Sequence, residues 1–273
     1  MGFKIGVQVY SVRDYAEKDF RATMQAIKAM GYDGVELAGA YGLSADEVKA
    51  VLSEVGLEAI SAHVPLGEMI GDPDKTFAFY REIGCRFVAV PWLEEARRPG
   101  NPGFEETVAA INEIGAKARE YGLQLLYHNH DFEFVKVDGE YALDMLYRVI
   151  PAEHLMTEID TCWVNVGGEN PAEYVKKYTG RAPIVHLKDF YMEKGATQDD
   201  MYELIGVDKK ANKTSAFEFR PVGHGVQKFP AIVEASAEAG AEWLVVEQDR
   251  PSLGLTSMES IDISRKYLRS IGL

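Results

Sequence analysis

The stretch EYGLQLLYHNH (residues 120–130) joins the end of an amphipathic helix to a glycine, a short apolar run and two histidines. A glycine after a helix suits a left-handed C-cap, and the apolar run has the length and composition of a β-strand. The same order of helix end, glycine, turn and strand recurs in AMGYDGVEL (29–37), EVGLEAIS (54–61), EIGCRFVAV (82–90) and EAGAEWLVV (238–246). Repeated β-α units with short links predict parallel strands joined by crossover helices.

The chain carries about eight such units, which is the number that closes a TIM barrel. The predicted strands are residues 4–10, 34–39, 57–64, 85–92, 123–130, 155–160, 183–189 and 243–249. We therefore expect an α/β fold, a (β/α)8 TIM barrel forming a single domain over residues 1–273. The alternative is an open doubly wound sheet, but the first strand is not followed by the glycine-rich turn typical of that fold.

The amino-acid composition disfavours some classes of binding partner. The chain has 29 basic and 43 acidic side chains, a net charge of −14, which disfavours nucleic acids because binding phosphates needs clustered lysine and arginine. No signal-peptide pattern and no apolar run of membrane-spanning length are present, so no membrane partner is expected. Two widely separated cysteines, Cys85 and Cys162, form no disulfide framework, and a cytoplasmic location is expected.

One long irregular stretch, residues 190–222, follows the seventh predicted strand and has a polar middle. Insertions of this length in a βα loop usually cover an active site or mediate a subunit contact, and we expect one of these two roles.

Polar side chains follow the apolar run of nearly every predicted strand. Since catalytic groups of a TIM barrel lie at the C-terminal ends of its strands, we expect these side chains to meet at one mouth. They are Gln8, Tyr10, Glu36, His63, Trp92, His128, His130, Glu158, Asp160, His186, Lys188, Glu247 and Asp249.

Crowded buried carboxylates repel each other unless a cation joins them, and the mixture of imidazole and carboxylate here suits a divalent metal such as Mn²⁺, Zn²⁺, Co²⁺, Fe²⁺ or Mg²⁺. Bound metal assists proton abstraction next to a carbonyl by polarising it. The expected ligands are His128, Asp160, His186 and Glu247. Glu158 is a fifth candidate, because residues i and i+2 of a strand share a face.

Further residues have a functional and a structural interpretation. Lys188 is expected either to stabilise an enolate or to pair with Asp189 or Glu247. The turn Gly223–Gly225 is interpreted chiefly as a connection, with a backbone phosphate nest as the weaker alternative. The residues expected to contact substrate, or else to make structural hydrogen bonds or rim packing, are Gln8, Glu36, His63, Trp92 and Trp163.

Five phrases together resemble the sugar phosphate isomerase/epimerase family of xylose isomerase-like TIM barrels, a group that includes ketose 3-epimerases, inosose dehydratase, 3-dehydroshikimate dehydratase and, more distantly, endonuclease IV. The phrases are HNHDFEF (128–134), TEIDTCWVNVGG (157–168), VHLKD (185–189), PVGHG (221–225) and VVEQD (245–249). The resemblance covers nearly the whole chain. It implies one divalent metal held by Glu, Asp, His and Glu from strands five to eight.

The match to this ligand set is incomplete. Asp160, His186 and Glu247 match the last three ligands, but His128 stands where relatives have the first glutamate, and Trp163 stands where many have a second histidine. The resemblance leaves open whether His128 or Glu158 completes the set. In the epimerases the first and last glutamates also move protons, so the change favours a lyase, with His128 or His130 as the base.

The sequence thus predicts a divalent-metal-dependent sugar isomerase or epimerase that abstracts a proton next to a carbonyl of a sugar or polyol substrate. The alternative is a lyase or dehydratase of a keto-sugar, keto-inositol or 3-keto-glycoside. The residues expected to move protons or to stabilise the enediolate are His128, His130, Glu158, Lys188 and Glu247. The acidic charge balance disfavours a DNA repair enzyme, and the many ionisable strand ends disfavour a non-catalytic barrel. A homo-oligomer is left open, since dimers and tetramers are common among relatives.

Overall fold

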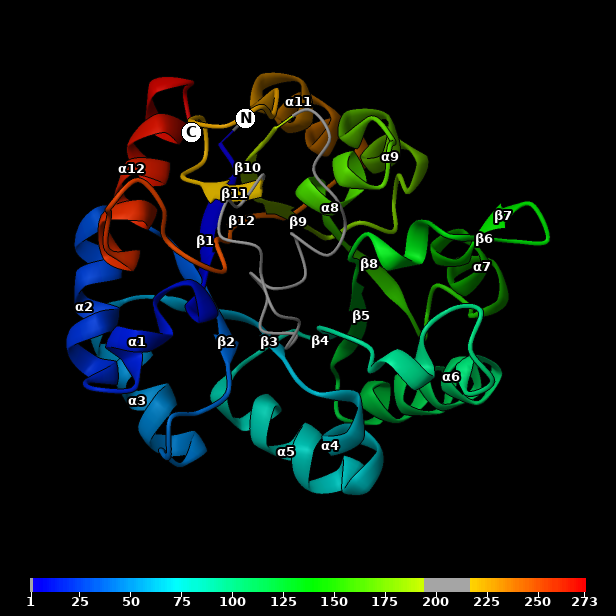
Figure 1. Cartoon of the computed structure of the whole chain (residues 1–273). Helices are drawn as coiled ribbons and strands as arrows, with labels where there is room; N and C mark the ends of the chain where they lie inside the picture. The colour runs from blue at the N-terminus through cyan, green and yellow to red at the C-terminus, as the bar shows by residue number, and fades with distance from the viewer. Residues whose placement is uncertain (1, 194–216) are drawn as a thin grey trace.

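The computed structural model describes residues 2–193 and 217–273, and its centre is a closed barrel of eight parallel strands (Figure 1). Around the barrel the strand order is β1-β12-β9-β8-β5-β4-β3-β2, and β1 pairs with β12 to close it. The strands are β1 (Lys4–Gln8), β2 (Gly34–Ala38), β3 (Glu58–His63), β4 (Phe87–Val90), β5 (Gln124–His128), β8 (Met156–Asp160), β9 (Ile184–Leu187) and β12 (Trp243–Val246). The predicted TIM barrel is confirmed, and each predicted strand contains one of these eight.

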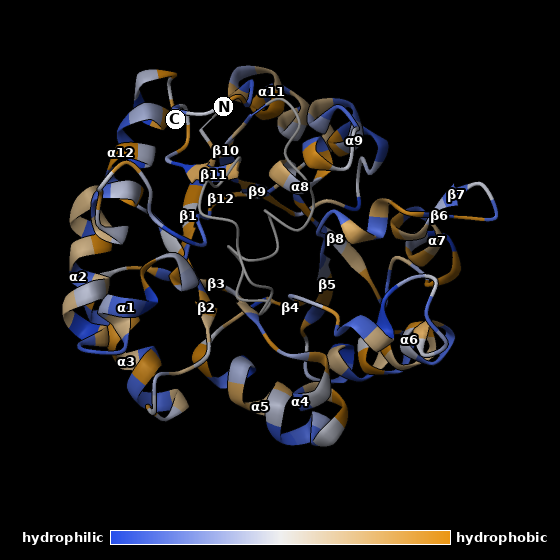
Figure 2. Ribbon diagram, in the orientation of Figure 1, coloured by the Kyte–Doolittle hydropathy of each residue, from blue (hydrophilic) through white to orange (hydrophobic). Residues whose placement is uncertain are grey.

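Helices form a ring outside the barrel, and the two chain ends lie near each other at its edge (Figure 1). Figure 2 shows hydrophobic and hydrophilic residues on the same outer helices, as expected where one face packs on a barrel and the other meets water. The helices are α1 (Arg13–Ala16), α2 (Phe20–Met30), α3 (Ala45–Val55), α4 (Leu66–Gly71), α5 (Pro73–Ile83), α6 (Phe104–Glu120), α7 (Ala142–Val149), α8 (Thr161–Val166), α9 (Pro171–Lys177), α11 (Phe229–Ala239) and α12 (Ser257–Ser270).

Local signals set the helix ends. Ser44 opens α3 with a capping box, in which its side chain accepts from the Glu47 N–H and the Glu47 carboxylate accepts from the Ser44 N–H. Gly84 ends α5 with φ of 110°, a conformation that side-chain-bearing residues rarely adopt. Gly56 ends α3 in the same left-handed conformation, and the two glycines make the turns into β3 and β4 short, as the recurring phrase predicted.

The barrel strands are shorter than predicted at their C-terminal ends. Residues 9 and 10 belong to the 3₁₀ turn η1 (Val9–Val12), because the Gln8 side chain accepts the Tyr10 N–H and turns the chain. His130, Lys188 and Asp249 likewise lie beyond the last paired residues of β5, β9 and β12. The polar residues therefore occupy the last paired positions of the strands, such as His128 and Glu158, and the positions just beyond them, at the mouth of the barrel.

An apolar layer closes the interior of the barrel at its N-terminal end. It consists of Ile60, Phe87, Ala89, Leu126, Ile184, Trp243 and Val245. Interior residues of a TIM barrel pack in layers, so the barrel is filled and forms no pore. Glutamate or histidine stands two residues after Leu126, Ile184 and Val245, and the same is true of the partly buried Met156 packed against this layer. The apolar layer is therefore the floor of a polar chamber.

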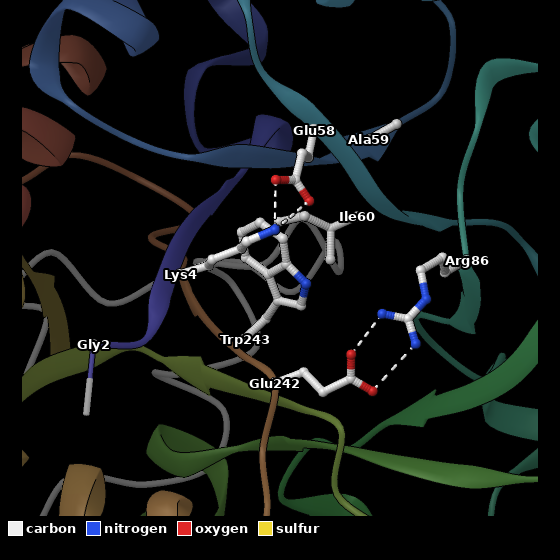
Figure 3. Close-up of a pocket in the computed structure, with 8 residues that line it drawn as sticks. All are labelled: Gly2, Lys4, Glu58, Ala59, Ile60, Arg86, Glu242 and Trp243. Atoms are coloured by element: carbon white, nitrogen blue, oxygen red, sulfur yellow. Dashed lines mark hydrogen bonds and ion pairs between the residues drawn. The ribbon is translucent and has the colours of Figure 1, made fainter.

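Below this floor, at the N-terminal mouth, lies a cavity of about 220 Å³ (Figure 3). Its charged groups pair with each other: Lys4 Nζ lies 2.6 Å from Glu58, and Arg86 lies 2.5 Å from Glu242, around the Trp243 indole. These pairs are exposed, and exposed pairs contribute little energy. Because every charge lining this cavity already has a partner, we assign it no chemical role.

Two small antiparallel sheets decorate the barrel: β6 (Lys136–Val137) with β7 (Glu140–Tyr141), and β10 (Asp189–Met192) with β11 (Phe217–Arg220). The second pair brackets residues 194–216, so the predicted role of the long insertion lies mostly outside the described residues. No helix in the described part of the chain combines the length and apolarity that crossing a bilayer requires.

A glycine inside α6 marks a close helix-to-loop contact. A Cβ atom on Gly115 would lie 2.2 Å from the backbone carbonyl oxygen of His154. We expect Gly115→Ala to lower the free energy of unfolding by about 1–3 kcal/mol, the usual cost of overpacking, although alanine is the better helix former. Urea unfolding measures this. Gly67→Ala in α4 is the matched control, since its Cβ would meet nothing within 4 Å; equal effects of both substitutions would contradict the prediction.

Candidate active site

A cavity of about 550 Å³ opens at the C-terminal mouth of the barrel, above the apolar floor. Its polar and aromatic lining comes from η1, from helices α4 and α5, and from the ends of five strands that barrel closure brings together. These lining residues are Tyr10, His63, Glu68, Tyr80, Trp92, His128, His130, Lys188, Glu247 and Asp249.

The HNH stretch sends its two histidines into this cavity and its asparagine away from it. Asn129 binds the backbone of Asp160 on β8: Asn129 Oδ1 accepts the Asp160 N–H at 2.9 Å and Asn129 Nδ2 donates to the Asp160 carbonyl at 3.3 Å. This amide thus extends the pairing of β5 with β8 by one residue. Behind it, the buried Glu133 accepts the His130 N–H and the Tyr127 hydroxyl, which fixes the turn after the strand.

Deep in the chamber, five side chains from five strands place their donor atoms together; we call them the inner set. They are Glu36, His63, His128, Glu158 and His186. Glu158 Oε1 lies 2.6 Å from His63 Nε2, 3.2 Å from His128 Nδ1 and 3.3 Å from His186 Nε2. Glu36 Oε1 lies 2.9 Å from His63 Nε2 and 3.0 Å from His186 Nε2. Every member except His63 is fully or almost fully buried.

In the inner set, carboxylates and imidazoles lie next to each other and shift each other's pKa values. Burial alone would lower the pKa of His63, but Glu36 and Glu158 outweigh it and raise that pKa to about 10. The pKa of His186 is raised well above its ordinary value by the same two carboxylates, against burial. Burial and the charge of Glu36 raise the pKa of Glu158 to about 7. Without a bound cation, protons on two imidazoles therefore neutralise the carboxylates.

A second group, the outer set, lies nearer the cavity: His128, Asp160, His186 and Glu247. The Lys188 ammonium lies among its carboxylates, with Nζ 3.3 Å from Asp160, 3.0 Å from Glu247 and 2.8 Å from Asp249. Burial opposes the charge on Lys188, but Asp249, Glu247 and Asp160 raise its pKa well above the ordinary value. Lys188 is therefore a buried, charged ammonium held by three carboxylates.

His130 shares a lowered pKa with His128, and burial is the largest cause for both. For His130 the positive charge of Lys188 lowers the pKa further, which favours the neutral imidazole. Its ring meets the Trp92 ring edge to face with centroids 4.6 Å apart, and stacks on Phe132 at 5.4 Å. Within residues 2–193 and 217–273 the Nδ1 atom of His130 is buried without a hydrogen-bond partner. A neutral imidazole has one acceptor nitrogen and one N–H, so the ring can take up one proton.

The predicted substrate-contacting residues separate into two groups. His63 and Trp92 line the cavity. Gln8, Glu36 and Trp163 are fully buried and do not: Gln8 Nε2 donates to Glu36 at 2.6 Å and orients it, and Trp163 packs beside His130 and Lys188. Glu36, interpreted from sequence as a contact to a hydroxyl, instead belongs to the inner set. The predicted proton-moving and ligand residues lie in the inner or outer set, except His130 and Lys188, and Lys188 pairs with carboxylates of the outer set.

Asp249 was expected at the mouth from the sequence but was given no role, and the structure places it against Lys188. Glu133 was not predicted and gives no sequence signal beyond its place beside the histidines. Of the two partners suggested for Lys188, Glu247 pairs with it, and no pair with Asp189 is seen among the described residues.

Asp189 faces the GHG turn. Its carboxylate accepts backbone N–H groups of Gly223 at 3.0 Å, Gly225 at 2.8 Å and Gln227 at 3.1 Å. The backbone nest considered from sequence exists, but this internal carboxylate fills it. The phosphate interpretation of the turn is therefore wrong.

The donors fit a divalent metal. The donor atoms of His63, His128, Glu158 and His186 lie within 4.8 Å of one another, and so do those of the two imidazoles and two carboxylates of the outer set. Among the described residues, two carboxylate oxygens of the inner set are buried without any hydrogen bond: Glu36 Oε2 and Glu158 Oε2. Buried polar atoms of this kind call for an unseen partner, and imidazole with carboxylate is a typical ligand combination for transition metals.

Comparison with known proteins agrees with this geometry. The family model of the xylose isomerase-like TIM barrel matches residues 24–271. An inosose dehydratase from Clostridium perfringens is 30% identical over 276 residues, covering 93% of this chain and 90% of that protein, and one from Lacticaseibacillus casei is 24% identical over 275 residues, covering 92% and 89%.

Solved structures show the same fold. A sugar phosphate isomerase/epimerase from Parabacteroides distasonis superposes with a TM-score of 0.80 and 20% identity, covering 100% of this chain and 95% of that one. The IolI protein, solved with a bound zinc atom, superposes with a TM-score of 0.72 and 17% identity, covering 98% and 97%.

Proposed function

Since the chain belongs to the xylose isomerase-like TIM barrel family, an enzyme family that acts on sugars, we propose that it is a metal-dependent lyase that removes water from a polyhydroxy ketone such as an inosose. The observation that carries this proposal is the pairing of a neutral base with a fixed cation on one cavity wall. His130 lines the cavity with a pKa lowered well below the ordinary value, and Lys188 lines it with a buried ammonium.

His130 and Lys188 have different roles in the proposed reaction. The neutral His130 imidazole can take the proton from the carbon next to the carbonyl, and the pair of electrons left behind moves onto the carbonyl oxygen. Lys188 is placed to stabilise the resulting negative oxygen. When the carbonyl re-forms, the C–O bond on the β-carbon breaks, and the leaving hydroxyl takes the proton from the His130 imidazolium. A ketone thus gives an unsaturated ketone and water.

A divalent metal, when bound by the inner or the outer donors, supplies Lewis-acid polarisation of substrate oxygens. The chain's own residues supply orientation. The edge-to-face contact of Trp92 and the stacking of Phe132 hold the His130 ring, while Trp163 packs against both His130 and Lys188 and keeps water from this corner.

The cavity suits an uncharged substrate. Among the described residues that line it, Lys188 is the sole lysine or arginine, and three carboxylates already surround its ammonium. A phosphate group would meet Glu247 and Asp249 at close range, which is repulsive. Hydroxyl groups, in contrast, find many acceptors there. We therefore propose a non-phosphorylated polyol ketone.

Elimination is favoured over the isomerisation that the sequence first suggested. The two-glutamate proton transfer of the epimerases lacks its first member, because residue 128 is histidine. The curated relatives described above are dehydratases. The isomerase or epimerase interpretation remains the alternative.

A product assay tests the proposal. We expect purified protein, supplied with Mn²⁺ or Co²⁺, to convert an inosose in D₂O to a dehydrated product, seen by NMR and by the ultraviolet absorbance of the new enone. A ketohexose and a ketohexose phosphate serve as comparison substrates, and the phosphate should be the poorest. Deuterium exchange or rearrangement without loss of water would support isomerase chemistry, and absence of both would overturn proton abstraction altogether.

A further inference from the structure

An arginine lies behind the aromatic rings that hold His130. Arg98 follows the 3₁₀ turn η2 (Glu95–Arg97) in the loop between β4 and α6, and it is not among the described residues that line the cavity. Its guanidinium carbon lies 4.2 Å from the centroid of the Trp92 ring and 4.1 Å from that of the Phe132 ring. One planar cation therefore contacts two rings, one from the loop after β4 and one from the turn after β5.

The two rings that Arg98 contacts are also the rings against which the His130 imidazole packs. Trp92 meets the imidazole edge to face, and Phe132 lies nearly parallel to it, with 6° between the two planes. Trp92 and Phe132 meet each other edge to face as well, with centroids 5.0 Å apart. The three rings form one cluster, so a shift of either outer ring changes the packing of the imidazole.

The position of Arg98 is itself fixed. Its Nε donates to the backbone carbonyl of Leu93 at 2.9 Å, and Leu93 is fully buried. A guanidinium is planar and weakly hydrated, so it can stack on ring faces while its N–H groups donate in the plane. Cation–π contacts become stronger as the groups lose water, and the Arg98 side chain is partly buried. Arg98 thus joins the loop after β4 to the turn after β5.

The orientation of the His130 ring is what these contacts determine. Glu133 accepts the backbone N–H of His130 and fixes the main chain, whereas the ring contacts of the imidazole are with Trp92, Phe132, Trp163 and His128. A general base has to lie within hydrogen-bond reach of the proton that it takes. Misplacement of a reacting group by about 1 Å can lower a rate by about 100-fold.

We propose that Arg98 is a positioning residue of the elimination reaction, and that it acts by holding Trp92 and Phe132 against His130. This inference rests on the proposed function, because it assumes that His130 is the base. Arg98 itself touches neither substrate nor reacting atoms.

Three variants test the role of the planar group. We expect Arg98→Met, which has a similar length but neither charge nor plane, to lower kcat with an inosose by about 10–100-fold and to change KM much less. Arg98→Lys keeps the charge but cannot lie flat on two rings, and it should still lose about 5-fold or more. Arg97→Met is the matched control, since the Arg97 side chain makes no hydrogen bond, ion pair or ring contact among the described residues. Wild-type kcat in Arg98→Lys would overturn the role of the plane.

A double-mutant cycle separates positioning from general stabilisation. If Arg98 acts through His130, Arg98→Met has no further effect once His130 is replaced, so the double variant should match the kcat of His130→Gln within about 2-fold. If the two effects multiply instead, Arg98 acts elsewhere, and this inference alone is overturned. A His130→Gln variant with near-normal kcat overturns the proposed function, and this inference with it.

Tryptophan fluorescence provides a readout that needs no substrate. Trp92 is partly exposed, whereas Trp163 and Trp243 are buried, so quenching by acrylamide reports mainly on Trp92. We expect Arg98→Met to be quenched more than the wild type and Arg97→Met to be quenched equally. The difference should vanish when both the wild type and Arg98→Met also carry Trp92→Phe. Unchanged quenching in a folded Arg98→Met variant would overturn the inference, because Arg98 would then not hold the Trp92 ring.

Discussion

The substitution His130→Gln is expected to lower kcat by about 10²–10⁴-fold, the range in which a positioned general base contributes. Glutamine has a similar size and preserves polar contacts at the cavity wall, but it takes no proton from carbon. Because His130 is assigned to neither donor set, metal content should be unchanged. Steady-state kinetics with an inosose, together with metal analysis, measure both quantities.

The pH dependence provides a second readout of the same residue. Burial and Lys188 lower the pKa of His130, so the base stays neutral as the pH falls through 6.5. In the wild type we expect kcat/KM to fall on the acidic side only below pH 6.5. In His130→Gln we expect this acidic fall to be absent, because the base that titrates has been removed and the rate is low at every pH. His224→Gln, on the surface, is the matched control. An acidic fall of kcat/KM that begins at or above pH 7, or a His130→Gln variant with near-normal kcat, would contradict the role of His130 as the base.

The substitution Lys188→Met is expected to reduce both activity and stability. Removing one partner of a buried ion pair typically costs about 3–5 kcal/mol, and here three carboxylates lose their shared cation. The enolate would also lose its positive neighbour, and we expect a fall in kcat of about 10²–10³-fold, as when one oxyanion donor is removed. Urea unfolding and kinetics measure the two effects.

The stability loss should depend on pH in a definite direction. Burial favours protonation of Glu247, but Lys188 outweighs it and holds the pKa well below the ordinary value. Without Lys188, the clustered carboxylates take up protons more readily when folded than when unfolded, so stability falls as pH rises through their raised pKa values. We therefore expect Lys188→Met to be more damaging at pH 8 than at pH 5. Lys4→Met, which removes an exposed pair, should cost no more than about 1 kcal/mol at either pH. A loss for Lys188→Met that is equal at both pH values would refute this account.

The barrel was predictable because its signal is local and repeated. Each glycine-ended helix and the apolar run after it can be recognised within about ten residues of sequence, and eight such units leave few alternatives. The polar strand ends were predictable for the same reason, since the C-terminal ends of barrel strands converge. The turn at Gln8 was not, because it depends on one side-chain hydrogen bond to Tyr10.

How deep in the barrel each side chain lies could not be predicted from the sequence. Glu158 and Asp160 share a face of β8, and sequence alone gave both as metal ligands; only the packing of neighbouring strands shows that one meets His63 and the other meets Lys188. The same is true of His128 and His130, of which the first lies in both donor sets and the second in neither. The contact that decides the role of Glu158 joins residues 95 positions apart.

The apolar floor, with Trp243 at its lower side, closes the chamber at its N-terminal end. Metal, substrate, product and the released water all pass through a single opening, so events at depth must follow an order. An ion held below the substrate loads first and leaves last. A chelator should therefore strip metal quickly from the free enzyme and slowly once a substrate analogue fills the mouth, which makes retention of the metal a direct report of substrate occupancy.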